Sequence, residues 1–241
     1  MNEDFCKIIK IIPTYNETEN IASLVRAIFE VSPRYSVLIV DDNSPDGTGQ
    51  AVEELAKVYP NLYVYQRMND RGFGKSYLDG FKKILSDDRY ETVVMMDADF
   101  SHDPNAVPPM VEKLSDCEVI VGSRYAPGGR SENWDLNRRI LSRFANYYAR
   151  TILGVPVLDL TSGFMCFRKS VLTKIDLDSV RSEGYAFMIE LKYRMIKAGC
   201  KICEHPIVLT ERRKGQSKMS AKVIWESIWL PWKIRVDKIP V

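Results

Sequence analysis

The sequence predicts an α/β fold with a mostly parallel, doubly wound sheet flanked by helices and a mixed C-terminal half. The first observation behind this prediction is a series of short apolar runs, which are typical of strands buried on both faces. The second is that segments with one apolar face at helical spacing separate these runs. The third is the composition, because 241 residues that are 45% hydrophobic can bury a sizeable core.

The expected strands and helices alternate regularly in the first half of the chain. The strands are expected at residues 8–12, 37–40, 62–65, 93–96 and 119–121. The apolar stripes of the helices between them cover residues 21–29, 51–59, 77–85 and 107–114. In such a sheet, ligands bind beyond the carboxyl ends of the strands, so a functional site is expected at that edge.

The second half of the chain lacks this alternation. Its expected elements are a helix at 140–153, a helix at 187–197, a strand at 202–209 and a basic loop at 211–222. No repeat or linker marks a separate domain, so residues 1–241 are expected to form one domain. Its expected parts are a nucleotide-binding half at 1–122, an acceptor and sugar half at 123–218, and an amphipathic C-terminal helix at 219–241.

Charge and cysteine content bound the class of protein. The chain carries 34 Lys plus Arg against 32 Asp plus Glu, which is too balanced for a protein that coats nucleic acid. Its apolar runs fall far short of the roughly 18 residues that a membrane span needs, and the acidic start at residues 1–4 differs from a signal peptide. Five cysteines without framework spacing are expected as free thiols, which favours a cytoplasmic protein.

Polar clusters follow three of the expected strands. They are Pro-Thr-Tyr-Asn-Glu at 13–17, Asp-Asp-Asn-Ser-Pro-Asp-Gly-Thr at 41–48 and Asp-Ala-Asp-Phe-Ser-His at 97–102. Helix caps and turns would explain several of these residues. The residues suited to that role are Asn16, Ser44, Asp46 and Thr48.

Capping does not explain Asp97 and Asp99. Two acids one residue apart after a buried strand repel each other unless a cation or hydrogen-bond donors lie beside them. Carboxylate oxygens of this kind suit Mg²⁺ or Mn²⁺, which could bridge a nucleotide diphosphate. We therefore expect a divalent-metal site at Asp97 and Asp99.

In this order, the three clusters resemble those of the inverting GT-A glycosyltransferases, specifically the dolichyl-phosphate (polyprenyl-phosphate) mannosyltransferases. Further matches are Gly-Ser-Arg-Tyr at 122–125, Asp-Leu-Thr-Ser-Gly-Phe at 159–164, Gly-Tyr-Ala-Phe at 184–187 and Arg-Arg-Lys-Gly-Gln-Ser-Lys at 212–218. The resemblance covers nearly the whole chain. It implies a GT-A fold, which is Rossmann-like, and transfer of mannose from GDP-mannose to dolichyl or polyprenyl phosphate with inversion.

The resemblance also implies roles for individual residues. The guanosine part would be held by Pro13, Tyr15, Glu17, Asp42 and the backbone of Val40. The metal and the diphosphate would be held by Asp97, Ala98 and Asp99. Phosphate or donor sugar would meet Arg124, Arg212 and Lys218. The expected catalytic residues are Asp97, Asp99 and Arg124. Some family members carry Gln where this chain has Ser101, so a Gln contact to the metal does not transfer.

The acceptor needs no base, because a phosphate monoester with a second pKa near ~6 is already mostly anionic at neutral pH. The candidates for binding the acceptor phosphate are Arg130, Arg138 and Arg139. The segment from Arg212 to Lys218 is expected to act as a charged flap over the donor.

The C-terminal helix is expected to meet a membrane. Its apolar residues at helical spacing are Trp225, Ile228, Trp229 and Trp232, and Lys222, Lys233, Arg235 and Lys238 surround them. Tryptophans beside cations are typical of a membrane interface, although an ordinary core-facing stripe is the alternative and is favoured for Ile228. We expect a peripheral protein on the cytosolic face of the endoplasmic reticulum or the plasma membrane, bound directly or through small membrane subunits.

Other classes fit less well. A P-loop kinase would use the Gly-Phe-Gly-Lys-Ser segment at 72–76, but the required earlier glycine is replaced by Asn69. We expect that segment to form a glycine-rich turn at a helix start beside the donor. UDP-glucose or another sugar nucleotide remains an alternative donor, and a non-catalytic nucleotide-binding module would not need both acids.

The remaining histidine and cysteine motifs have structural explanations. Cys200 and Cys203 are expected on opposite faces rather than in a zinc or redox site. His102 is expected to shape the start of a helix rather than to act as a base.

Overall fold

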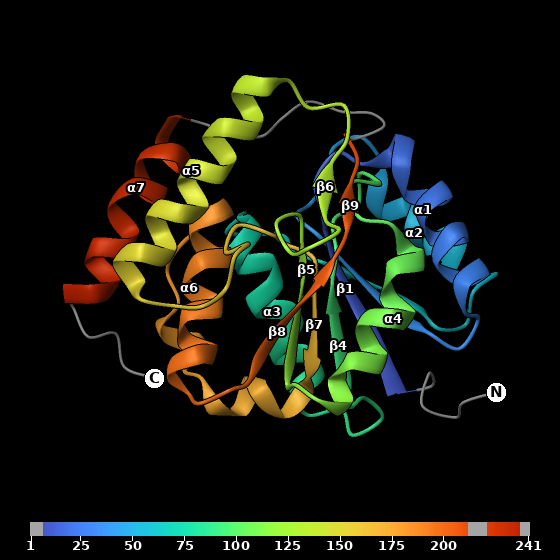
Figure 1. The fold of residues 1–241 in the computed structure, drawn as a ribbon. Helices are drawn as coiled ribbons and strands as arrows, with labels where there is room; N and C mark the ends of the chain where they lie inside the picture. The colour runs from blue at the N-terminus through green and yellow to red at the C-terminus, as the bar shows by residue number, and fades with distance from the viewer. Residues whose placement is uncertain (1–6, 212–220, 237–241) are drawn as a thin grey trace.

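The structure, a computed structural model, describes residues 7–211 and 221–236 (Figure 1). Its centre is a seven-stranded sheet with the order β3-β2-β1-β4-β7-β5-β8. The strands are β1 (Ile8–Thr14), β2 (Ser36–Asp41), β3 (Leu62–Gln66), β4 (Thr92–Met95), β5 (Val119–Ser123), β7 (Met165–Arg168) and β8 (Ile202–Pro206). The predicted mostly parallel sheet is confirmed, and the mixed second half is explained by β7.

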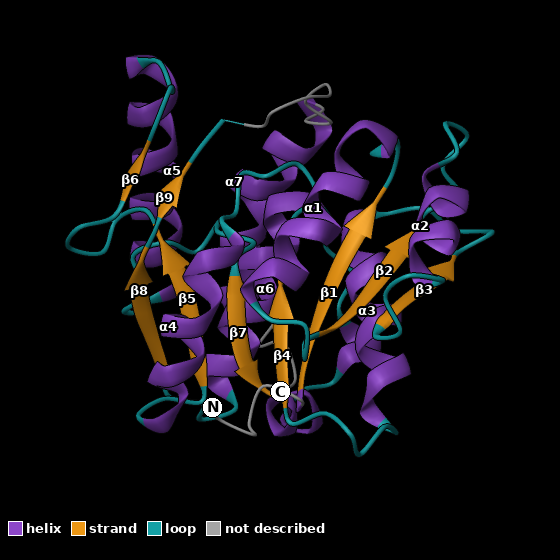
Figure 2. Ribbon diagram, turned by 90° about the vertical axis from the view of Figure 1, so that its right-hand side faces the viewer, coloured by secondary structure: helices purple, strands orange, loops and turns teal. Residues whose placement is uncertain are grey.

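Strand β7 lies between β4 and β5 and is antiparallel to both. Figure 2 shows it running against its neighbours. The other paired strands of the sheet are parallel. Because β7 runs the opposite way, the loop before it arrives at the edge where the parallel strands end, and it adds residues 159–164 to that edge.

Two helical layers cover the sheet (Figure 1). One layer contains α1 (Thr18–Val31), α2 (Thr48–Ala56) and α4 (Val107–Glu112), and the other contains α3 (Phe73–Leu85), α5 (Leu136–Leu153), α6 (Gly184–Lys197) and α7 (Ala221–Val236). The alternation of a strand divides its side chains between the layers. In β1, Ile9 and Ile11 face the α3 layer, whereas Ile8 and Ile12 face the α1 layer.

Two helices of the second half begin earlier than the sequence predicted. Helix α5 starts at Leu136 rather than near residue 140, because the side chain of Asp135 caps it by accepting a 2.8 Å hydrogen bond from the N–H of Arg138. Helix α6 starts at Gly184 rather than near residue 187.

The single strand predicted at 202–209 was wrong. The chain leaves the main sheet after β8, and β9 (Val208–Leu209) pairs instead with β6 (Arg130–Ser131) in a separate two-stranded ribbon. The N–H of Arg130 bonds to the carbonyl of Ile207 at 3.0 Å, which continues this ribbon.

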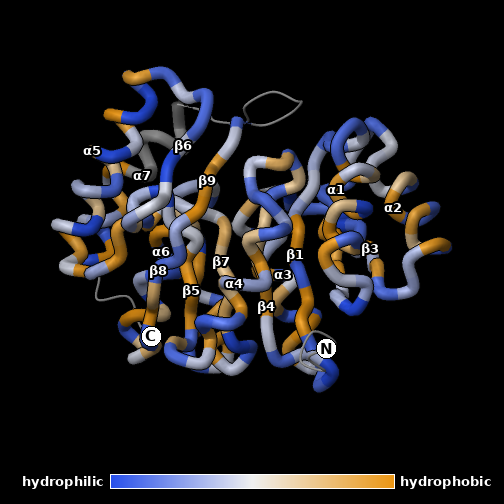
Figure 3. The backbone as a smooth tube through the Cα atoms, turned by 45° about the vertical axis from the view of Figure 1, so that its right-hand side comes forward, coloured by the Kyte–Doolittle hydropathy of each residue, from blue (hydrophilic) through white to orange (hydrophobic). Residues whose placement is uncertain are grey.

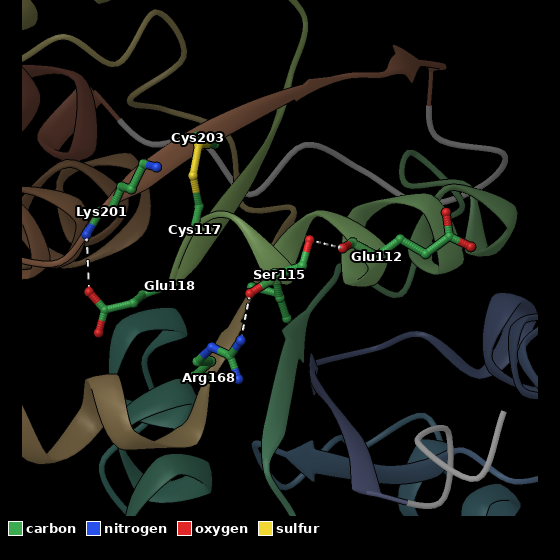
Figure 4. The surroundings of a disulfide bond; sticks show 8 residues. Glu112, Ser115, Cys117, Glu118, Arg168, Lys201 and Cys203 are labelled. Atoms are coloured by element: carbon green, nitrogen blue, oxygen red, sulfur yellow. Dashed lines mark hydrogen bonds between the residues drawn. A yellow bond between two sulfur atoms is a disulfide. The ribbon is translucent and has the colours of Figure 1, made fainter.

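Cys117 and Cys203 form a disulfide, with their Cα atoms 6.1 Å apart (Figure 4). The expectation of free thiols was therefore wrong for this pair. The parallel register of β5 and β8 pairs Ile120 with Cys203 and brings Cys117, two residues before β5, next to β8. Cys200 lies in the α3 layer and Cys203 packs against the α1 layer, so their predicted separation is confirmed.

Helix α7 packs on α5 and α6 (Figure 1). Among its described side chains, those of residues 228–236, the buried ones are Leu230, Pro231 and Ile234, whereas Ile228 is 42% exposed. The core position favoured for Ile228 was wrong, because the packed face of the helix lies at a different phase. The side chain of Trp225 lies outside the described residues. Among the described residues, no helix is both long and apolar enough to span a membrane.

Candidate functional site

A cavity of about 450 Å³ opens where β1, β2 and β4 end. Its walls include seven of the predicted donor-site residues, namely Pro13, Tyr15, Glu17, Asp42, Asp97, Ala98 and Asp99. Val40 is buried within β2 and does not line the cavity. Arg212 and Lys218 lie outside the described residues. The three polar clusters, far apart in sequence, thus meet at one edge of the sheet.

Hydrogen bonds between the first two clusters fix the floor of this cavity. Asp41 accepts from the hydroxyl of Thr14 at 2.8 Å and from the hydroxyl of Ser44 at 2.6 Å. The hydroxyl of Ser44 accepts from the N–H of Asn16 at 3.0 Å. The hydroxyl of Thr48 accepts from the N–H of Glu17 at 2.9 Å. Polar residues of the second cluster therefore act as caps for the first.

Asp42 faces the cavity and holds the glycine-rich turn before α3. Its carboxylate pairs with the guanidinium of Arg67 and accepts from the N–H of Gly72 at 3.0 Å. Arg67 also bonds to Asp79 at 2.7 Å. The predicted turn at the start of α3 is present, and Arg67, which the sequence analysis did not consider, anchors it.

The segment before α6 covers the same turn. The carboxylate of Glu183 accepts a 2.8 Å hydrogen bond from the N–H of Gly74. A Cβ on Gly74 would lie only 2.6 Å from the backbone oxygen of Ser182, so the close approach requires glycine here. The carboxylate of Glu183 thus binds the backbone N–H of Gly74, a group that in a P-loop would bind a phosphate.

Arg71 and Tyr15 form an exposed rim of the cavity. The guanidinium of Arg71 lies 4.7 Å from the centroid of the Tyr15 ring and donates to its hydroxyl at 2.8 Å. The same guanidinium bonds to the backbone oxygen of Asn43 at 3.3 Å. The stacked pair offers a flat cationic and aromatic surface at the end of the cavity where the first two clusters meet.

His102 holds the loop that carries the two acids. Its Nδ1 accepts from the N–H of Asp97 at 3.0 Å, and its ring stacks on Phe164 with centroids 4.8 Å apart. Burial lowers the pKa of His102 to about 4, so Nδ1 is an unprotonated acceptor at neutral pH. Asp99 accepts from the N–H of Ser101 at 3.0 Å, which fixes the second acid on the same loop.

Asp97 and Asp99 are suited to a divalent cation that shares its ligands with a substrate. Among the described residues, no three Asp, Glu, His or Cys side chains converge on one point. Mg²⁺ is held typically by one or two carboxylates together with substrate phosphates and water. Two hard oxygen donors at the mouth of a cavity fit that arrangement.

A second cavity of about 70 Å³ adjoins the first, and Asp97, Asp99 and Thr161 line both. Its charged lining includes Arg124, Arg138 and Glu211 beside the two acids. The two cavities therefore meet at the two acids.

Among the three predicted acceptor arginines, Arg138 is the one that lines a cavity. Its guanidinium lies 4.0 Å from the centroid of the Trp134 ring and 3.4 Å from Glu211. Arg130 forms a surface pair with Glu132, and Arg139 is exposed. Neither of the last two lines either cavity.

Arg124 is buried and forms a two-pronged ion pair with Asp159. Its Nε and Nη2 donate to the carboxylate at 2.7 and 2.6 Å, and Nη2 also donates to the hydroxyl of Thr161 at 2.7 Å. Burial alone would raise the pKa of Asp159, but the charge and hydrogen bonds of Arg124 outweigh it and lower the pKa. The protein's own carboxylate thus holds this guanidinium at the wall of the second cavity.

Two further residues hold the segment 158–162 and were missed by the sequence analysis. The buried ammonium of Lys192 donates to the carbonyls of Leu160 and Ser162 at 2.9 and 2.6 Å. Glu204 accepts from the N–H groups of residues 158 and 159 at 2.9 and 3.0 Å. The motif at 159–164 marked this loop, but no local pattern marked its distant partners.

Comparison with known proteins gives concordant matches. Residues 10–176 match the family described as glycosyl transferase family 2. The chain is 42% identical over 233 residues to the polyprenol monophosphomannose synthase of Mycolicibacterium smegmatis, with 95% of this chain and 88% of that protein covered. It is 37% identical over 222 residues to the undecaprenyl-phosphate mannosyltransferase of Micrococcus luteus, with 92% and 91% covered.

A third relative is the dolichol-phosphate mannosyltransferase of Pyrococcus furiosus, at 32% identity over 244 residues, with 97% of this chain and 66% of that protein covered. Among solved structures, glucosyl-3-phosphoglycerate synthase from Mycobacterium tuberculosis, in complex with Mn²⁺, UDP-glucose and phosphoglyceric acid, matches with a TM-score of 0.66. The match covers 94% of this chain and 80% of that chain at 19% identity. At this identity the likeness shows the fold alone, and it confirms the predicted GT-A architecture.

Proposed function

The chain belongs to glycosyl transferase family 2, and from this premise we propose that it transfers mannose from GDP-mannose to a polyprenyl (dolichyl-type) phosphate with inversion. The observation that carries the proposal is that a large cavity and a small cavity lined by two arginines meet at Asp97 and Asp99. One is suited to a sugar nucleotide and the other to an anionic acceptor. The names of relatives from three organisms, which describe mannose transfer to polyprenyl-type phosphates, support the sugar and the acceptor of this proposal.

The donor binds in the larger cavity. Pro13, Tyr15, Glu17 and Asp42 hold the guanosine, and Ala98 lies against the diphosphate. The backbone contact expected from Val40 is not part of this proposal, because Val40 does not line the cavity. The volume of about 450 Å³ supports this assignment, because it falls in the range of small-molecule sites. Arg212 and Lys218 close over the diphosphate as a charged flap.

Asp97 and Asp99 would hold Mg²⁺ or Mn²⁺, and the positive charge supplied there would stabilise the departing GDP. His102 supports this role, because its hydrogen bond to the N–H of Asp97 fixes the loop that carries both acids.

The acceptor phosphate enters the second cavity. Arg138 binds it there, and Arg124 supplies positive charge between acceptor and donor. The phosphate attacks the anomeric carbon from the face opposite GDP, so the configuration inverts. No protein base is needed, because the attacking oxygen is already anionic at neutral pH. Arg130 and Arg139 act as outer charges that attract the acceptor.

An exposed apolar face supports docking to a lipid surface. On α5, the side chains of Leu136, Ile140, Phe144 and Tyr147 point outward, and the arginines Arg139, Arg143 and Arg150 lie on the same helix. Figure 3 shows hydrophobic positions on α5 where this helix extends beyond the sheet. On α7, Trp229 and Trp232 are 63% and 48% exposed.

The hydroxyl of Tyr148 joins the two helices. It donates to the carbonyl of Ile228 at 3.0 Å and accepts from Trp232 at 2.9 Å. Aromatic and apolar side chains beside cations suit the interface of a membrane with anionic lipids. These side chains support the proposal of a peripheral enzyme at a membrane surface, bound either directly or with a small membrane subunit.

The test is an assay of the purified protein with Mg²⁺ or Mn²⁺, a panel of radiolabelled sugar nucleotides and polyprenyl phosphates. Extraction into organic solvent then separates lipid-linked sugar from free nucleotide. We expect labelled lipid from GDP-mannose and little from UDP-glucose. Preferential labelling from UDP-glucose, or no lipid product from any donor, would contradict the proposal.

A further inference from the structure

Helix α5 enters the body of the protein at Asn146. No residue from Leu136 to Ala145 is buried, whereas the side chain of Asn146 is only 2% exposed. A buried amide costs stability unless hydrogen bonds satisfy it. The partners of Asn146 therefore show what the outer half of α5 is attached to.

Most of those bonds go to a single residue of the site. The amide nitrogen of Asn146 donates to the carbonyl of Ser142 at 2.9 Å and to the hydroxyl of Thr161 at 3.0 Å. The amide oxygen accepts from the N–H of Thr161 at 3.2 Å. Two bonds to one residue fix a direction as well as a distance, so the helix is oriented relative to this loop.

The hydroxyl of Thr161 is the centre of the arrangement. It accepts from Arg124 at 2.7 Å and from Asn146 at 3.0 Å, and it donates to Asp159 at 3.3 Å. A hydroxyl offers one donor and two acceptor positions, and all three are used here. Thr161 lines both cavities, whereas Asn146 lines neither. Asn146 is thus one residue removed from the basic wall of the second cavity.

A second bond ties α5 to the end of β5. The hydroxyls of Tyr125 and Ser142 lie 2.7 Å apart. Ser142 and Asn146 are one helical turn apart and therefore on the same side of α5. Two consecutive residues after β5, Arg124 and Tyr125, are consequently linked to that side of the helix.

The hydrogen bonds of Asn146 and Ser142 form a joint between α5 and the residues beside the second cavity. The geometry points to a role for this joint, and that role rests on the proposed function. The phosphate of a lipid-embedded acceptor lies at a set height above the apolar layer. If the outward side chains of α5 sit in that layer, the orientation of α5 decides how close the phosphate comes to Arg124. We propose that Asn146 is a positioning residue that sets the lipid-facing side of α5 at a fixed orientation to the second cavity.

The effect of breaking the joint is selective. Without the Asn146 amide, Thr161 keeps its bonds to Arg124 and Asp159, so the cavity itself stays assembled. The outer half of α5, which has no buried residue of its own, is then held less firmly through the hydroxyl contact of Ser142 with Tyr125, and its orientation to the second cavity varies more. Transfer to an acceptor in a bilayer suffers, whereas transfer to an acceptor dissolved in water does not.

The test compares Asn146→Leu with the unaltered chain on two acceptors. One is a long-chain polyprenyl phosphate in vesicles of phosphatidylcholine and phosphatidylglycerol, and the other is a short prenyl phosphate in solution. We expect kcat/KM for the vesicle acceptor to fall about tenfold, while the soluble acceptor and the donor KM change less than about twofold. Vesicle binding, measured by flotation, should be unchanged.

Three variants separate positioning from general damage. Leu24→Ala removes a buried side chain from α1, in the opposite layer, and controls for lost stability. Thr161→Val should lower transfer to both acceptors, and Thr161→Ser should restore it because the hydroxyl remains. Two results would overturn this inference and leave the proposed function standing. One is that Asn146→Leu is at least as active on vesicles as Leu24→Ala, and the other is that it loses equal activity on both acceptors. An unaltered chain that transfers to neither acceptor overturns the proposed function and this inference with it.

Discussion

The carboxylate of Glu183 accepts a hydrogen bond from the backbone N–H of Gly74 at 2.8 Å. One residue immediately precedes α6 and the other lies in the first turn of α3, so the contact joins two helix starts at the larger cavity. Unpaired N–H groups at a helix start attract anions. In this protein a side chain takes that place and fixes the turn at the larger cavity.

Glu183→Ala should therefore weaken donor binding. Loss of one hydrogen bond to a partly exposed carboxylate costs about 1 kcal/mol, which corresponds to a rise of about fivefold in the donor KM. Glu183→Gln keeps a carbonyl acceptor and should recover most of the affinity. Glu54→Ala, which removes an exposed carboxylate on α2, is the matched control and should be silent. Equal donor KM values for all three variants would show that the contact has no part in binding.

Asp99→Ala should abolish transfer, and Asp97→Asn should lower it by about a hundredfold or more, because both changes remove a carboxylate from the cation. Steady-state rates over a titration of Mn²⁺ measure the effect. Asp103→Ala is the control, since this acid caps the next turn by accepting from Asn105 at 2.9 Å and lines neither cavity. Normal turnover of folded Asp99→Ala in buffer treated with chelator would contradict the metal assignment.

Lys10 should make stability depend on pH. Its side chain is fully buried with its ammonium 3.7 Å from the centroid of the Tyr35 ring, and burial lowers the pKa of Lys10 to about 7. Between pH 7 and 10.5 the unfolded chain keeps a proton that the folded chain has lost. The free energy of unfolding therefore rises with pH through that window. The slope is at most about 1.4 kcal/mol per pH unit.

Lys10→Met should consequently raise the Tm most at pH 6, with a gain that shrinks towards pH 10. Thermal unfolding of both proteins across this range provides the measurement. A gain that stays constant from pH 6 to 10 would mean that Lys10 carries the same charge in the folded and unfolded chains.

Combined substitution of Trp225, Trp229 and Trp232 by Ala should reduce flotation with anionic vesicles severalfold, because indole rings favour the membrane interface. Phe144→Ser on α5 should act in the same direction. Val58→Ala is the control, as Val58 is 71% exposed but lies two residues after the end of α2, in the other layer. Circular dichroism must show that each variant is folded. Unchanged flotation would assign these side chains to a protein partner or to packing.

Arg212→Ala combined with Lys218→Ala should raise the donor KM and lower kcat, since both charges are expected to meet the diphosphate in the transition state. Initial rates over a range of GDP-mannose concentrations measure both constants. If the double variant kept the kcat and the donor KM of the unaltered chain, residues 212–218 would have no part in donor binding.

The sequence predicted those parts of the site that local patterns encode. Residues Pro13, Asp42 and Asp97 each follow an apolar run, and parallel strands bring such positions to one edge whatever the rest of the chain does. The predicted start of α5 lies four residues after the observed start. The prediction followed the apolar stripe of the helix, whereas the helix begins at its cap residue, Asp135.

Contacts between distant segments were not predictable in this way. The pairing of Arg124 with Asp159 and the support of residues 158 and 159 by Glu204 depend on the insertion of an antiparallel strand that no periodicity signals. Cys117 and Cys203 are adjacent only because β8 pairs with β5. A single sequence records neither register nor strand order.

The position of β7 has a consequence for how the protein could be divided or recombined. Strands β4 and β5 belong to the first half of the chain, but they are joined only through β7, which comes from the second half. A fragment ending at residue 122 would leave β4 with an open edge and β5 without its partners, a condition that favours aggregation. Residues 1–122 are therefore not a module that could be transplanted alone, and chimeras within this family would have to exchange β7 together with the strands on both sides of it.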